Sequence, residues 1–181
     1  MFLLLTPQQQ TVSADSTKSM HLMIIDHLID WGHKKSDWPR KVEAIIIHSS
    51  FNALTPDSFS LNGILDEYKE INVSPHFIID REGGIHRLVK EEDVAYHAGK
   101  SRLPDGVTNV NQVSIGIEII NTETDGPTEG QYSSLAKLVS HLKAEYTIKF
   151  ILGHSDIAPG RKTDPWLFDW NKFNSLLRGY R

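Results

Sequence analysis

Residues 42–48 form an almost unbroken apolar run, rich in β-branched side chains, that ends in a histidine. Such a run predicts a central strand buried on both faces, and such a strand needs a layer of chain on either side of its sheet. Residues 114–120 predict a second strand, with isoleucines on one face and Ser114, Gly116 and Glu118 on the other. The short apolar run 150–153 predicts a third.

The remaining elements fit around these strands. Two more strands are predicted on either side of a hairpin turn, and three segments have helical spacing or a helical stripe of apolar residues. The strands are expected at residues 73–80 and 85–89, with a further strand or short helix at 21–31; the helices are expected at 61–71, 131–146 and 166–177; loops are expected at 32–40 and 91–106. The sum is a mixed α/β fold, a central mixed sheet of five or six strands flanked by helices.

The length of 181 residues suits one domain, which we expect over residues 21–181 after a flexible lead-in at residues 1–20. Met1 and the four apolar residues after it are too short for a bilayer span and lack a preceding positive region. We therefore expect no transmembrane segment. A cytoplasmic location is slightly favoured, and the periplasm or envelope stays open if the true start lies upstream.

Composition excludes several classes of site. The chain has no cysteine, so disulfides and thiolate metal sites are excluded. A net charge of −4 without a basic block argues against nucleic acid or an anionic membrane as partner. The nine histidines are an excess of the commonest metal ligand. We expect a monomer.

A loop-like stretch at residues 153–165 carries the densest set of chemical groups. His154 lies where the predicted strand ends and this loop begins, the usual place for catalytic and binding residues. Asp164 lies ten residues later, so the loop must fold back to bring the two side chains together. An imidazole and a carboxylate held together suit zinc. A capped turn with surface charges remains an equal alternative for this loop alone.

A catalytic zinc uses three protein ligands and an open position for water. His48, His154 and Asp164 would make such a set, with one zinc per chain. His76 and His97 could each replace one ligand in a rival set. We interpret His76, next to a proline, as structural or hydrogen-bonding, and His97 as part of a cleft wall that contacts substrate.

Glu118 lies among isoleucines, where a charge is costly unless something uses it. Gly116 leaves space on the same face for a close approach. The alternative is a structural ion pair with a lysine. If zinc is present, Glu118 is suited to take a proton from its water, and Lys162 to steady an oxyanion. Ser49 and Ser155 lie outside any Gly-x-Ser-x-Gly elbow, which disfavours a serine hydrolase.

Five segments occur in the order seen in zinc-dependent N-acetylmuramoyl-L-alanine amidases, at residues 45–48, 73–79, 96–99, 111–118 and 153–165. The chain resembles most closely the AmpD-type branch, which is related to phage lysozyme-amidases and peptidoglycan recognition proteins. The resemblance covers roughly residues 40–178, and its last segment is the most specific.

This resemblance implies a mixed sheet flanked by helices, zinc in a groove, and cleavage of the amide between N-acetylmuramic acid and L-alanine of peptidoglycan or a muropeptide. By matching position it makes His48, His154 and Asp164 the zinc ligands, Glu118 the catalytic carboxylate and Lys162 its partner on the oxyanion. The candidate substrate-binding residues are Ser49, His97, Asn111 and Arg161.

Three positions depart from the pattern. Pro75 replaces a tyrosine of the phage-type branch, Ser49 replaces an asparagine or threonine, and Trp166 replaces a glycine and is expected to narrow or line the groove. Two rival functions stay open. One is a peptidoglycan-binding module that does not cut, and the other is a lysin or effector of the same fold that acts on intact cell wall.

Overall fold

The computed structural model describes residues 22–180; the predicted lead-in at residues 1–20 lies outside them. Three neighbouring strands of the sheet run parallel to one another, β7 (Ser114–Ile120), β3 (Ala44–Ser50) and, at the edge, β8 (Phe150–Gly153). All three were predicted, β7 and β8 with the same bounds. Every residue of β3 and β7 is buried, as expected for strands covered on both faces, whereas the edge strand β8 is partly exposed.

The predicted mixed sheet is confirmed. Its order in residues 22–180 is β1-β5-β4-β7-β3-β8, with β4 (Phe77–Ile79) parallel to β7 and antiparallel to β5 (Ile85–Arg87). The segment 21–31 yields only the two-residue β1 (Ile25–Asp26), parallel to β5.

A second, two-stranded sheet pairs β2 (His33–Lys34) with β6 (Val94–Ala95). Both lie in segments that we predicted as loops, so those predictions were wrong at these residues. Strands of two residues carry no periodic pattern, and this pair exists only because distant parts of the chain meet.

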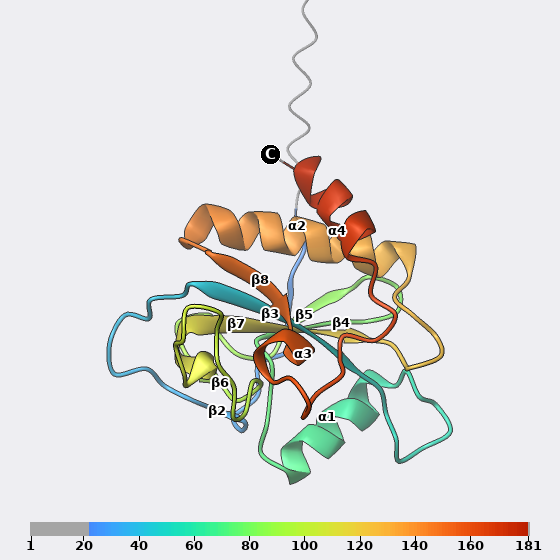
Figure 1. The fold of residues 1–181 in the computed structure, drawn as a ribbon. Helices are drawn as coiled ribbons and strands as arrows, with labels where there is room; N and C mark the ends of the chain where they lie inside the picture. Colours follow the sequence, from blue (N-terminus) through green and yellow to red (C-terminus); the bar gives the residue numbers. More distant parts are fainter. Residues whose placement is uncertain (1–21, 181) are drawn as a thin grey trace, which may run out of the picture.

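Two helices cover one face of the sheet, α2 (Glu129–Glu145) and α4 (Trp170–Arg178) (Figure 1). Leu135, Leu138 and Val139 of α2 pack on the isoleucines of β3 and β7 that point to this side. The helix α4 begins four residues later than predicted, because Asp169 caps it by accepting hydrogen bonds from the backbone N–H groups of Asn171 and Lys172.

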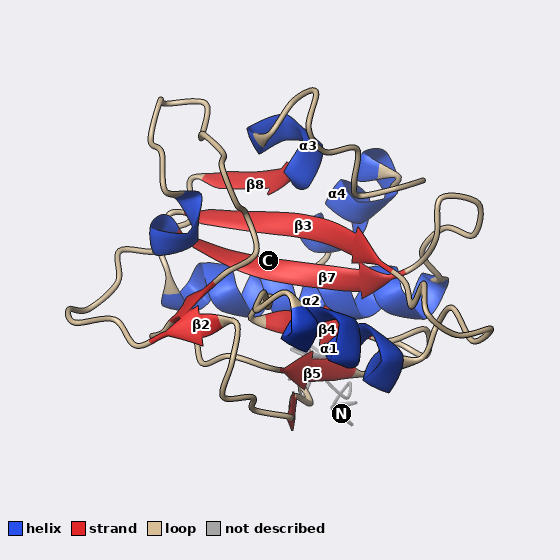
Figure 2. Ribbon diagram, turned by 90° about the horizontal axis from the view of Figure 1, so that it is seen from below, coloured by secondary structure: helices blue, strands red, loops and turns tan. Residues whose placement is uncertain are grey.

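The opposite face is covered by α1 (Leu61–Glu70), the short α3 (His154–Ile157), the 3₁₀ turn η1 (Val110–Val113) and loops; in Figure 2 α1 lies in front of the sheet and α2 behind it. The helix α1 was predicted, whereas α3 falls in a stretch predicted as loop. Because side chains alternate along a strand, Ala44, Ile46 and His48 reach this second face together with Glu118.

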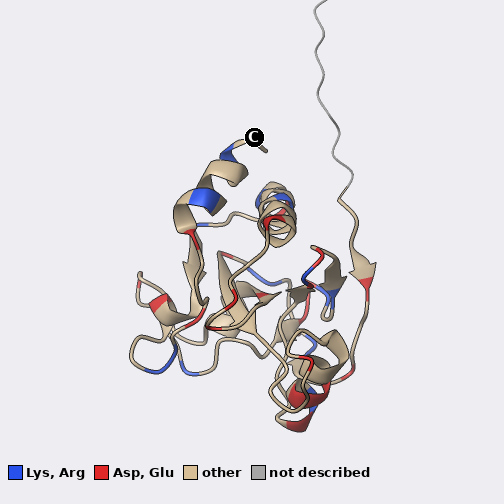
Figure 3. Cartoon of the chain, turned by 90° about the vertical axis from the view of Figure 1, so that its right-hand side faces the viewer, with Lys and Arg blue, Asp and Glu red and all other residues tan. Residues whose placement is uncertain are grey.

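Charged residues of both signs are interspersed along residues 22–180 (Figure 3). No helix within this part of the chain is both long and apolar enough to cross a membrane.

One buried side chain fixes α2 to the sheet. Gln131 closes a capping box with Thr128, and its amide nitrogen donates to the carbonyl groups of Ile79 and Ile120 at the ends of β4 and β7. This explains why α2 begins at Glu129, two residues before the predicted start.

We predict that Gln131→Ala lowers the free energy of unfolding by about 3 kcal/mol, because it removes half of the capping box and two buried hydrogen bonds to carbonyl groups of the sheet. Urea unfolding measures the change. His141→Ala, an exposed position on α2, is the matched control and should change stability by less than about 0.5 kcal/mol. Equal effects of the two substitutions would contradict this role of Gln131.

Candidate metal centre

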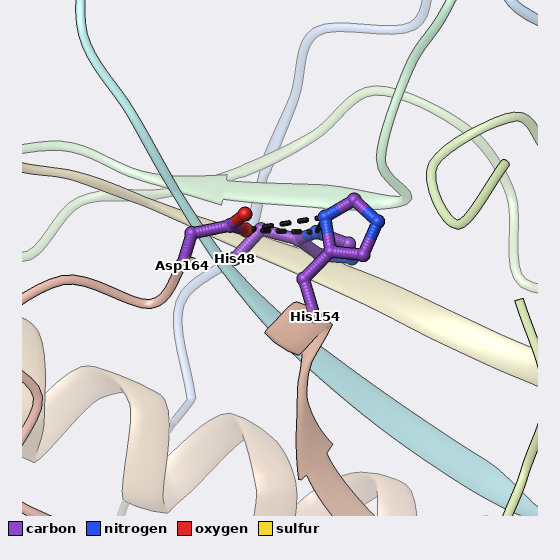
Figure 4. A group of neighbouring side chains, drawn as sticks. All are labelled: His48, His154 and Asp164. Carbon is purple, nitrogen blue, oxygen red and sulfur yellow. Dashed lines mark hydrogen bonds and ion pairs between the residues drawn. The ribbon is translucent and has the colours of Figure 1, made fainter. Parts of the chain in front are cut away.

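Two neighbouring parallel strands deliver two imidazoles to the same edge of the sheet. Ile47 of β3 is paired with Gly153 of β8, so His48 and His154 follow side by side. The loop after α3 folds back over the end of β8, and Pro165 packs against the backbone of Gly153, which has no side chain to block it. A Cβ there would lie 2.6 Å from a ring carbon of Pro165. Asp164 thereby joins the two histidines (Figure 4), and the Ser155 N–H donates to its carbonyl oxygen at 2.8 Å.

The three predicted ligands form one buried group. The Nδ1 atoms of His48 and His154 are 3.0 Å apart, and Oδ2 of Asp164 lies 3.4 Å and 3.2 Å from them. Donor atoms bound tetrahedrally to zinc at about 2.0–2.1 Å lie about 3.3 Å from one another. The spacing of the three atoms therefore matches one face of a zinc coordination tetrahedron.

The hydrogen bonds of His154 assign its protons. Its Nε2 lies 3.3 Å from the carbonyl oxygen of Ala98, which can only accept, so Nε2 carries the hydrogen. Because a neutral imidazole has one N–H, Nδ1 of His154 then presents a lone pair towards His48 and Asp164.

A longer chain of hydrogen bonds assigns His48. Ser114 donates its hydroxyl hydrogen to the Val110 carbonyl at 2.7 Å, so its oxygen accepts from Nε2 of His97 at 3.2 Å. Nδ1 of His97 is then a lone pair and accepts from Nε2 of His48 at 2.9 Å. This leaves Nδ1 of His48 as a lone pair as well.

Three acceptor atoms thus face one another in a buried site. Burial lowers the pKa of His48 to about 4, which keeps its ring neutral at pH 7. Burial raises the pKa of the Asp164 carboxyl, but the imidazoles of His154 and His48 beside it outweigh this effect and hold the pKa below its usual range. The lone pairs of these three atoms repel one another unless a cation lies between them. Two imidazoles and one carboxylate are a ligand set that suits zinc.

The close approach expected at Gly116 is confirmed, and the group that approaches is the ring of His97, which any side chain at position 116 would strike. His97 was predicted to contact substrate from a cleft wall. It lines the cleft, and it also holds His48.

Neither rival ligand belongs to the group. Within residues 22–180 the one set of side chains that could hold a metal comprises His48, His154 and Asp164. Nδ1 of His76 instead accepts from the Gly116 N–H at 3.1 Å, and its Nε2 lies 3.2 Å from the Asp93 carbonyl. His76 therefore supports the strand that carries Glu118.

Glu118 pairs in register with His48 and is only 8% exposed. Burial, reinforced by the charge of Asp164, raises the pKa of Glu118 to about 8, although the hydroxyl groups of Tyr68 and Ser50 act in the opposite direction. Its Oε2 has no hydrogen-bond partner, and in the described part of the chain it forms no ion pair with a lysine. The alternative of a structural ion pair is therefore not supported.

A cleft of about 480 Å³ opens over this centre and includes all four predicted substrate-binding residues in its walls. Besides His97, the other three also form hydrogen bonds within the chain. Ser49 accepts from the Trp166 N–H, Asn111 accepts from the backbone of His97 and Ala98, and Arg161 donates to the carbonyls of Ala98 and Lys100. They shape the cleft as well as line it.

Sequence reasoning missed two groups beside the centre. Ser114 was placed on the correct face of its strand by the two-residue period, but its bond to His97 was not foreseen. Tyr68 reaches Glu118 from α1, and burial together with the charge of Glu118 raises the pKa of its hydroxyl well above its ordinary value. No local pattern in the sequence signals that contact.

Comparisons with known proteins identify the family of this chain. A family profile described as N-acetylmuramoyl-L-alanine amidase matches residues 38–166. The chain is 33% identical to the 1,6-anhydro-N-acetylmuramyl-L-alanine amidase AmpD of Haemophilus influenzae, over 77% of this chain and 85% of that protein. It is 41% identical to the Escherichia coli protein of the same name, over 61% of this chain and 62% of that one.

Two solved structures share the fold. The crystal structure of a Se-Met AmpD derivative aligns with a TM-score of 0.69 and 30% identity, over 83% of this chain and 93% of that one. The amidase AmiD of Escherichia coli, in complex with anhydro-N-acetylmuramic acid-L-Ala-D-γ-Glu-L-Lys, aligns with a TM-score of 0.66 and 26% identity, over 79% of this chain and 60% of that one.

We predict that His97→Ala weakens zinc binding by about 10–100-fold, because His48 loses the acceptor that fixes its tautomer and ring orientation. His97→Gln, whose amide oxygen can accept the same hydrogen bond, should retain more affinity. Competition with a chromophoric chelator measures both, with His141→Ala as control. An unchanged zinc affinity in His97→Ala would refute the orienting role.

A second prediction concerns metal-free protein. Because the folded-state pKa of Glu118 is raised to about 8, its contribution to stability is complete below its ordinary value of 4.5 and is lost as the pH rises through 8. The melting temperature of Glu118→Gln relative to that of the original protein should therefore increase from pH 5 to pH 9. Thermal melts in chelator measure it, with Glu145→Gln on the surface of α2 as control. A constant difference across this range would contradict the raised pKa.

Proposed function

Because the chain belongs to the N-acetylmuramoyl-L-alanine amidase family, we propose that it hydrolyses the amide between N-acetylmuramic acid, in its ordinary or anhydro form, and the L-alanine of the stem peptide. The observation that carries the proposal is the convergence of three acceptor atoms from His48, His154 and Asp164 beneath a cleft. The chain is accordingly an enzyme whose expected cofactor is one zinc ion.

His48, His154 and Asp164 would hold this zinc, and three protein ligands are the number that catalytic zinc sites use. When bound, zinc polarises the substrate carbonyl and makes its water acidic enough to act near neutral pH. The hydrogen bonds from His48 to His97 and from His154 to Ala98 keep the two ligand nitrogens unprotonated, so the protein is preorganised for the metal.

Glu118 is the proton carrier in this proposal. Its carboxyl group is buried, unpaired at Oε2 and has a pKa raised to about 8; a cation nearby draws that value down towards neutrality. A carboxyl group poised in this range can accept a proton from the attacking water and return it to the departing amine of L-alanine.

Lys162 is the expected partner on the oxyanion. It lies two residues before Asp164, lines the cleft and is exposed at its mouth. Its ammonium charge also opposes protonation of His48. A positive charge placed here would stabilise the negative charge that develops on the substrate carbonyl oxygen.

The substrate class follows from the relatives. Identities of 33–41% join this chain to proteins named 1,6-anhydro-N-acetylmuramyl-L-alanine amidase, against 26% to the endolysin of Klebsiella phage KP32. This favours soluble anhydro-muropeptides over intact cell wall. A binding module that does not cut is disfavoured, since the ligand set and Glu118 are complete. The cytoplasmic location and the monomeric state stay predictions.

We predict that His48→Ala and Asp164→Ala lose both zinc and activity, whereas Glu118→Ala keeps zinc and loses turnover by about 10²–10⁴-fold. Elemental analysis gives the zinc content, and mass spectrometry of a digested anhydro-muropeptide gives the rate. Trp38→Ala, an exposed position outside the cleft, is the control. Normal turnover by Glu118→Ala would remove the proposed proton carrier. Faster cleavage of intact sacculi than of the soluble anhydro-muropeptide would favour the alternative hypothesis of a lysin that acts on intact cell wall.

A further inference from the structure

Trp166 stands in the wall of the cleft and is held there by the chain at several points. Its backbone N–H donates to the Ser49 hydroxyl oxygen at 3.0 Å, and its carbonyl accepts from the side chain of the buried Asn121 at 3.1 Å. Its indole N–H donates to Thr163 at 3.0 Å. Because the indole N–H already donates to Thr163, the part of Trp166 that remains free to contact a ligand is the face of its ring.

A second aromatic ring extends this wall. Phe51, which follows the end of β3, lies with its ring centre 5.8 Å from that of Trp166, and both line the cleft. We name Phe51 and Trp166 together the aromatic wall. Both side chains are only partly buried. A rigid aromatic surface left partly open in a cleft is the usual form of a contact for an uncharged, flat group.

Charged side chains of both signs line the cleft, among them Glu67, Lys162 and Arg161. The carboxylate of Glu67 accepts from the N–H of Ala53, two residues after Phe51 of the aromatic wall, at 2.6 Å. Arg161 is bound instead to the carbonyls of Ala98 and Lys100.

The aromatic wall and Arg161 are attached beside different ligands of the metal centre. The aromatic wall is attached through Ser49, the neighbour of His48, whereas Arg161 shares the Ala98 carbonyl with His154. A substrate whose scissile amide lies at the centre can therefore contact aromatic rings beside His48 and a cation beside His154.

We propose that the aromatic wall binds the muramyl ring of the substrate through its C–H face, and that the stem peptide extends towards Arg161. This rests on the proposed amidase function. In a ligand of the kind bound to AmiD, anhydro-N-acetylmuramic acid-L-Ala-D-γ-Glu-L-Lys, the sugar is uncharged and the γ-linked glutamate has a free carboxylate. The slightly positive C–H bonds of the sugar suit the negative face of an indole, while Glu67 repels the peptide carboxylate from the aromatic wall.

The test compares two substrates. One is N-acetylmuramoyl-L-Ala-D-γ-Glu-L-Lys; the other is D-lactoyl-L-Ala-D-γ-Glu-L-Lys, which has the same scissile amide and peptide but no sugar ring. The lactoyl peptide is assayed as a substrate, or as a competitive inhibitor if turnover is too slow to follow. The variants are Trp166→Ala and Trp166→Phe, with Trp38→Ala, a tryptophan 81% exposed and outside the cleft, as the matched control.

Trp166→Ala should raise KM for the muramyl peptide by about ten-fold with little change in kcat, and leave KM or Ki of the lactoyl peptide unchanged. Trp166→Phe, which keeps an aromatic face, should be intermediate. Zinc content and melting temperature establish that the variants are folded and loaded.

Two results would overturn the proposal. An equal loss with both ligands would mean that Trp166 contacts the peptide or only supports the site, and an unchanged KM for the muramyl peptide would mean that the wall binds nothing. In both cases the original protein still cleaves the muramyl peptide, so the amidase function survives. If the original protein cleaves neither substrate, the proposed function itself fails.

Discussion

The site depends on one unfavourable arrangement. Two imidazole nitrogens with lone pairs and one carboxylate oxygen lie 3.0–3.4 Å from one another in a buried position. The bond from His154 to the Ala98 carbonyl and the chain from His48 through His97 to Ser114 remove the protons that could relieve it. A divalent cation turns this repulsion into attraction. The remaining features of the cleft become useful only once that cation is present.

The sheet makes this arrangement possible. Parallel pairing of β3 with both β7 and β8 brings His48, Glu118 and His154 to one edge, and the packing of α2 on the far face keeps these strands in place. Gly116 admits the ring of His97, and Gly153 admits Pro165, which returns Asp164 to the centre. Neither position tolerates a side chain, so the backbone itself is shaped for the site.

The sequence contained the strands and the reacting groups. A two-residue period and an apolar run that ends in a polar residue are local signals, and they were enough to predict the central strands, His48 and His154 at strand ends and the buried Glu118. Asp164 was predicted from the loop at residues 153–165 and from the family resemblance. The bond between His97 and His48, the contact of Tyr68 with Glu118 and the β2–β6 pair arise where distant segments meet, and no local pattern encodes them. The start of α4 is set by the Asp169 cap, a local signal that the expected helix at residues 166–177 overlooked.

The central claim is that the three acceptor atoms hold one metal ion, and a crystal structure of the zinc-loaded protein with anomalous data at the zinc edge tests it most directly. We expect a single anomalous peak at about 2.0–2.2 Å from Nδ1 of His48, Nδ1 of His154 and a carboxylate oxygen of Asp164. A map without a peak at this position, or with a zinc bound through Nε2 of either histidine, would contradict the account.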